Sequence, residues 1–170
     1  MNVYLKYSIV MREIMAKVFI YPTTSLILSD MVSRLGHTPL GSALSVRDKV
    51  QQGGVEGIDS PPLNLTPDDA KRGLKWAAVE VPPGVRGRMS LLGPHIAEAE
   101  AAIILDDPLA FGCMGCARTN ELTTFLLKEA DIPLLELNYP QTDDEGFAFV
   151  MAIKEFLKGL EEKGGEVQHE

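Results

Sequence analysis

The residues of this chain that most clearly indicate chemistry are its two cysteines, Cys113 and Cys116, which form a Cys-x-x-Cys pair. An apolar run that ends in Asp106 and Asp107 precedes them, and a helical pattern follows them directly. A helix N-terminus favours a thiolate over a thiol, because the helix dipole and the unbonded backbone amides stabilise negative charge. The thiolate is the form that binds metals or attacks electrophiles. The pair therefore indicates a metal site or a thiol-based reaction.

Three kinds of site are consistent with the pair. A tetrahedral zinc ion or a four-iron cluster needs four ligands, so other groups would have to complete it: a second copy, another subunit, an external ligand, or side chains such as His37, His95 or the aspartates. A dithiol redox site is the second possibility, and an interaction module that completes a site on a larger assembly is the third. The structural alternative is that both thiols are small buried apolar side chains.

Other polar residues near the cysteines could bind a ligand. Arg118 could hold an anion or stabilise a thiolate, or form only a local ion pair. Arg86 and Arg88, in the sequence GVRGR, could bind a phosphate or a carboxylate, or lie in a solvated loop. The full set of expected binding residues is Asp106, Asp107, Arg118, Asn120, Tyr21, Thr23, Ser25 and Tyr139.

The elements that would position these residues alternate between strands and helices. Apolar and β-branched runs predict strands at 17–21, 37–40, 74–81, 102–105 and 133–137. Helical spacing predicts a helix after Thr23 or Thr24 that ends at Gly36. Further helices are expected from Thr66, from 93 to 101, after the cysteines, and after a capping box at Thr142.

This alternation implies a mainly parallel sheet with right-handed crossovers. We therefore predict a single three-layer α/β domain that is Rossmann-like in the broad sense. The chain has no Gly-x-Gly-x-x-Gly sequence, so a dinucleotide site is not indicated. Ligands of such sheets bind outside the carboxyl ends of the strands, where the loops 21–25, 106–116 and 138–143 would meet.

Length and charge limit the classes of function. The chain has 170 residues and a formal net charge of −8, which argues against binding to nucleic acid or to an anionic membrane. We expect one domain at 17–163, an N-terminal extension at 1–16 that could serve self-association, and an acidic tail at 164–170. No apolar run is long enough for a membrane span, and the two cysteines are not a secreted disulfide framework, so we expect a cytoplasmic protein.

Four segments together resemble the methanogenesis marker protein 5 family of archaea: YPTTSLILSDMVSRLGH, GRMSLLGPHIAEAEAAIILDD, FGCMGCARTNEL and IPLLELNYP. The resemblance covers most of residues 17–160. It implies an archaeal accessory protein with a role associated with methanogenesis, in assembly or activation of the methane-forming reductase or its nickel cofactor, together with other methanogenesis proteins. The thiol loop after a strand is also similar to the Rossmann-like halves of 2-hydroxyacyl-CoA dehydratase subunits, which implies an iron–sulfur cluster.

Overall fold

The computed structural model describes residues 15–42, 65–106 and 114–165. Within these ranges four parallel strands form one sheet in the order β2-β1-β3-β4. The strands are β1 (Lys17–Tyr21), β2 (Thr38–Leu40), β3 (Ala101–Asp106) and β4 (Leu134–Asn138). Each coincides with a predicted strand, and the predicted parallel pairing is confirmed.

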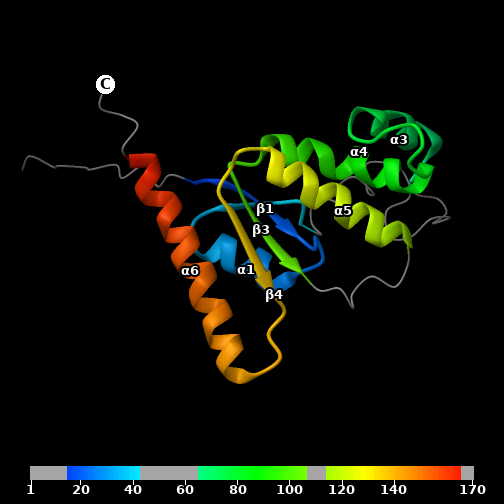
Figure 1. Cartoon of the computed structure of the whole chain (residues 1–170). Coiled ribbons are helices and arrows are strands. Elements are labelled where there is room, and N and C mark those ends of the chain that lie inside the picture. Colours follow the sequence, from blue (N-terminus) through cyan, green and yellow to red (C-terminus); the bar gives the residue numbers. More distant parts are fainter. Residues whose placement is uncertain (1–14, 43–64, 107–113, 166–170) are drawn as a thin grey trace, which may run out of the picture.

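Helices cover both faces of this sheet, which confirms the three-layer α/β architecture (Figure 1). Helices α1 (Leu26–Arg34) and α6 (Asp143–Gly165) pack on one face, and α4 (Pro83–Glu98) and α5 (Met114–Glu129) pack on the other. A short helix, α3 (Pro67–Arg72), leads into a 3-10 turn, η1 (Gly73–Lys75), and both pack against α4.

Strand β3 separates the two halves of the core. Its residues Ala101–Leu105 are all at most 4% exposed. Because side chains alternate across a strand, Ile103 joins the cluster under α1 and α6, whereas Ile104 joins the cluster under α4 and α5. This double burial explains why the sequence of β3 is continuously apolar, as in other central parallel strands.

The strands that follow β1 in the sequence lie on both sides of it in the sheet, with β2 on one side and β3 on the other. After β1 the chain passes through α1 to β2, and it then crosses back to form β3 against the opposite edge of β1. The carboxyl ends of β1 and β3 therefore flank a topological switch point, the place where open α/β sheets bind ligands. Tyr21 ends β1 there, beside Ile104 of β3.

The predicted strand at 74–81 is wrong. The structure has η1 and a turn there, and Leu74 and Val79 are 47% and 66% exposed. Trp76 instead packs against Gly93 so closely that a Cβ on this glycine would lie 2.2 Å from the indole ring. The apolar character of the segment thus reflects helix packing at a glycine and not membership of the sheet.

The predicted helix start at 93 is also wrong, because α4 begins ten residues earlier. Pro83 occupies its first turn, a position that tolerates proline since the missing N–H would have no helical partner. Pro94 lies inside the helix and is exposed, so its ring is accommodated at the solvent side. As a result the GVRGR sequence is helical, and Arg88 is held on a regular element.

The predicted end of α1 and the predicted start of α3 are confirmed, whereas the predicted cap of α1 is replaced by a neighbouring residue. Gly36 has a φ of 82°, as expected for a left-handed stop after α1, and Thr66 forms a complete capping box with Asp69 at α3. The cap of α1 is Ser25 instead of Thr23 or Thr24, because the turn after the cis Tyr21–Pro22 bond uses the two threonines. None of the helices that the structure describes has the length and apolar character needed to cross a bilayer.

Candidate functional site at the carboxyl ends of β1 and β3

Tyr21 lies at the centre of the candidate site. It is 7% exposed and packs in the same cluster as Val85 and Met89 of α4. Its hydroxyl makes no hydrogen bond to any residue in the described ranges. The pKa of Tyr21 is raised to about 12, mainly by burial; the charge of Cys116 contributes to this rise, and the charge of Arg88 opposes it. Tyr21 therefore stays a neutral hydrogen-bond donor at physiological pH.

Cys116 lies in the first turn of α5 and is half-buried. Two threonines of α5 are buried, one bonded within the helix and one in contact with α4. The hydroxyl of Thr119 donates to the backbone carbonyl of Gly115 at 2.8 Å, and the hydroxyl of Thr123 contacts the sulfur of Met89 on α4 at 3.8 Å. The charge of Cys116 contributes to the raised pKa of Tyr21, so α5 places this thiol within electrostatic range of the end of β1.

Arg88 completes the cluster from α4. It is half-buried and lies close enough to lower the pKa of Tyr21. Neighbouring Arg86 differs, because its guanidinium donates to the backbone carbonyls of Val81 at 3.0 Å and Ala70 at 3.4 Å. The two arginines of the GVRGR sequence thus differ: Arg86 binds backbone carbonyls of the segments before α4, and Arg88 acts on Tyr21 through its charge.

The other predicted binding residues are dispersed around this edge. The hydroxyl of Ser25 accepts the N–H of Leu28 at 3.4 Å, so Ser25 serves as a helix cap. Asp106 is exposed at the end of β3, in register with Asn138. The remaining residues are Thr23 and Asn120, which are half-buried, and Tyr139, which is 54% exposed. Cys113 and Asp107 lie outside the described residues.

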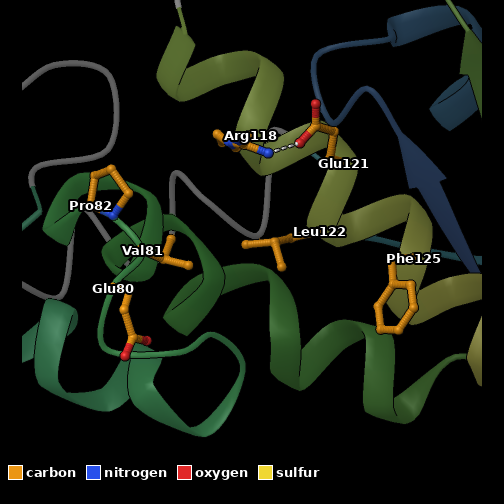
Figure 2. A pocket seen from close by; sticks show the side chains of 7 residues that line it. All are labelled: Glu80, Val81, Pro82, Arg118, Glu121, Leu122 and Phe125. Atoms are coloured by element: carbon orange, nitrogen blue, oxygen red, sulfur yellow. Dashed lines mark hydrogen bonds and ion pairs between the residues drawn. The ribbon is translucent and has the colours of Figure 1, made fainter.

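Arg118 lies two residues after Cys116 but takes part in a local ion pair. Its Nη1 is 2.6 Å from a carboxylate oxygen of Glu121, and both side chains are about 60% exposed. The pair borders a groove of about 550 Å³ between α5 and the turn before α4 (Figure 2). The groove is lined by Glu80, Val81, Pro82, Arg118, Glu121, Leu122 and Phe125. Neither Tyr21 nor Cys116 lines this groove. The sequence did not indicate the groove, because Glu80 and Val81 were predicted to lie in a strand.

Both histidines considered as ligands lie toward the amino ends of the strands, opposite the candidate site: His37 directly precedes β2, and His95 lies shortly before β3. His37 is buried: its Nδ1 accepts the N–H of Ala16 at 3.3 Å, and its Nε2 lies 3.1 Å from the carbonyl oxygen of Leu157. With Nδ1 as the acceptor, Nε2 is the ring nitrogen that donates to the carbonyl oxygen of Leu157. His95 lies in the last turn of α4, where burial lowers its pKa and Glu98 opposes that effect. Within the described ranges, no three His, Cys, Asp or Glu residues are grouped to hold a metal ion.

The parallel sheet has helices on both faces and polar side chains at its switch point. The protein therefore belongs to the α/β class, with a candidate ligand site at the carboxyl ends of β1 and β3. Comparison then places the chain in a family. Residues 16–160 match the family model of an uncharacterized protein conserved in archaea, DUF2112, and the chain belongs to this family.

A relative with a similar sequence is an uncharacterized protein from Methanocaldococcus jannaschii. It is 55% identical over 149 residues, which cover 87% of this chain and 97% of the relative. No solved structure matches the chain.

Proposed function

We propose that this protein is an accessory protein associated with methanogenesis whose cysteine loop supplies thiolate ligands to a metal ion or an iron–sulfur cluster. Another subunit would complete the ligand set. The role would be in assembly or activation of the methane-forming reductase or its cofactor. The process is taken from the resemblance to methanogenesis marker protein 5. The observation that carries the site is the position of Cys116, half-buried in the first turn of α5 at the switch point.

The groups around Cys116 suit a thiolate-bound metal. The first turn of α5 contains no acidic residue, so its dipole is available to stabilise negative charge on sulfur. Tyr21 stays protonated because its pKa is about 12, so its hydroxyl can donate to a ligating sulfur. Hydrogen bonds of this kind tune the potential and the affinity of metal–sulfur sites. Arg88 offsets part of the negative charge that such a site gathers.

Metal and sulfide analysis tests this proposal. The wild type and the Cys113→Ser/Cys116→Ser variant are purified anaerobically, and both are checked for folding by thermal unfolding. We expect bound metal in the wild type and its loss in the variant. Met114→Ser is the matched control, because Met114 lies in the same turn and is 77% exposed, and it should keep the metal. Equal metal content in all three proteins would contradict the proposal.

A second candidate function is a small enzyme that uses Cys116 as a nucleophile or both cysteines as a dithiol. The observation that favours it is that Cys116 and the guanidinium of Arg88 both act on Tyr21 through their charges, because a cation close to a thiol activates it. This candidate predicts alkylation of Cys116 with an inflection below the ordinary thiol pKa of about 8.5. Slow alkylation with an ordinary inflection would argue against it, and two unreactive thiols would favour a non-catalytic scaffold.

A further inference from the structure

We propose that the groove between α5 and the turn before α4 is a docking site for a short basic and apolar segment of another protein. The docking depends on the lining of the groove and does not need the cysteines to bind a metal. Arg118 lines the groove two residues after Cys116, so a segment bound there would lie beside the cysteine loop. In this way the groove would hold the subunit that completes the metal site, a role that rests on the proposed function.

The first observation is the shape of the groove. Its volume of about 550 Å³ is within the usual range of binding pockets, about 300–1,000 Å³. One wall is a single stripe of α5, because the lining residues 118, 121, 122 and 125 repeat at helical spacing. At 1.5 Å per residue this stripe is about 10 Å long, the span of about three residues of an extended segment. The other wall is the turn at 80–82 (Figure 2).

The second observation is the apolar surface of the groove. Val81 and Pro82 contribute to it from the turn, and Leu122 and Phe125 contribute from α5. Leu122 points from α5 toward Val81 (Figure 2). Phe125 is 58% exposed, although the same helix buries Leu127 in the core. An exposed aromatic ring beside other apolar residues is typical of a surface that binds an apolar side chain of a partner.

The third observation is the charge of the groove, which indicates the kind of partner. Glu80 forms no hydrogen bond or ion pair with any residue that the structure describes. Its carboxylate lies apart from the Arg118–Glu121 ion pair on the other wall (Figure 2). A cation of the partner would pair with Glu80, and a second would share Glu121, because an exposed ion pair such as Arg118–Glu121 is weak. The groove therefore suits a segment in which basic residues flank an apolar one.

The charge of the whole chain opposes two other occupants. Its formal net charge is −8, so a second copy would bring more acidic than basic groups to a groove with an unpaired carboxylate. A nucleic acid or an anionic lipid surface would be repelled for the same reason. A basic segment is attracted both by the groove and by the chain as a whole, so it is the occupant that the charges favour.

A peptide titration followed by NMR tests the proposal. The probe is the peptide Lys-Leu-Lys, acetylated and amidated at its ends, and it is added to the isotope-labelled full-length chain. We expect it to shift the backbone amide signals of Val81, Leu122 and Phe125. Two control peptides should bind at least about threefold more weakly: Glu-Leu-Glu, which reverses the charges, and Lys-Ser-Lys, which removes the apolar side chain.

Two substitutions in the groove separate its charge from its apolar surface. Glu80→Gln should weaken the binding of Lys-Leu-Lys about threefold, the effect of one exposed ion pair. Phe125→Ser should weaken it about fivefold, because it removes the exposed ring. Both side chains are exposed, and thermal unfolding checks that the variants fold. Glu155→Gln is the matched control: it removes the same charge from an exposed position of α6, on the other face of the sheet, and should leave the affinity as in the wild type.

Several results would overturn the proposal. These are the absence of shifts at the groove, equal affinity for Lys-Leu-Lys and Glu-Leu-Glu, and equal losses with Glu80→Gln and Glu155→Gln. Shifts of the same amides that depend on protein concentration without any peptide would assign the groove to a second copy instead. The metal analysis described above uses the cysteine variants and no peptide, so either proposal can fail without the other.

Discussion

Replacing Tyr21 by phenylalanine tests whether the Tyr21 hydroxyl serves to bind a ligand or to stabilise the fold. The ring of Tyr21 is 7% exposed and fills the core beside Met89, and phenylalanine preserves this packing. A hydrogen bond inside a protein typically contributes about 0.5–1.5 kcal/mol, but the Tyr21 hydroxyl makes none with the described residues. We therefore expect Tyr21→Phe to change the free energy of unfolding at pH 7 by less than about 0.5 kcal/mol.

The same substitution should matter at alkaline pH. The folded protein raises the pKa of Tyr21 from 10.0 to about 12, mainly by burial. Between these values the unfolded chain releases the proton and the folded chain keeps it, so the wild type loses stability as the pH rises above 10. At about 1.4 kcal/mol for each pKa unit, the loss approaches about 2–3 kcal/mol near pH 12. Tyr21→Phe removes this part of the alkaline destabilisation.

Urea unfolding at pH 7 and at several values between 9 and 11.5 measures both effects. The control is Tyr139→Phe, because Tyr139 is 54% exposed and its substitution should leave both the neutral and the alkaline behaviour as in the wild type. A loss of more than about 1.5 kcal/mol for Tyr21→Phe at pH 7 would show that the hydroxyl supports the fold. Identical alkaline curves for Tyr21→Phe and the wild type would refute the assigned burial.

Three further substitutions test the elements around the site. Gly93→Ala would place a Cβ 2.2 Å from the Trp76 ring, so despite the better helix propensity of alanine it should destabilise the protein by about 1–3 kcal/mol in urea unfolding. Ser25→Ala removes the cap that accepts the N–H of Leu28 at 3.4 Å, and should cost about 0.5–1 kcal/mol by the same assay. Burial lowers the pKa of His95, so the unfolded chain binds its proton first. Stability should therefore fall as the pH drops below about 6.5, and thermal unfolding of His95→Gln should show a smaller fall.

The sheet was predictable because the central strands, which are buried, have recognisably apolar sequences. Strands β1 and β3 are buried on both faces, so each is a short, nearly continuous apolar run bounded by turn-forming or polar residues. The segment 74–81 is apolar for another reason. Trp76 is accommodated by Gly93, a contact between parts of the chain that local sequence does not encode, and a propensity for strands could not reveal it.

The candidate site was predictable only in part. The rule that parallel strands present their carboxyl ends at one edge predicts that Tyr21 and Cys116 lie in neighbouring segments, and in the structure the charge of Cys116 acts on Tyr21. Arg88 was not assigned to the site, because the glycines of GVRGR favoured a loop. The signal that could have corrected this was Pro83, which suits the first turn of a helix. Ser25 and Arg118 were expected to bind a ligand, and the structure uses them for a cap and a local ion pair.

X-ray absorption spectroscopy at the metal edge of the anaerobically purified wild-type protein tests the proposed metal site most directly. If thiolates of Cys113 and Cys116 bind the metal, the spectrum contains a sulfur shell at about 2.3 Å, and this shell disappears in the Cys113→Ser/Cys116→Ser variant. A metal surrounded only by oxygen and nitrogen, or a sulfur shell that survives the double substitution, would contradict the proposed site.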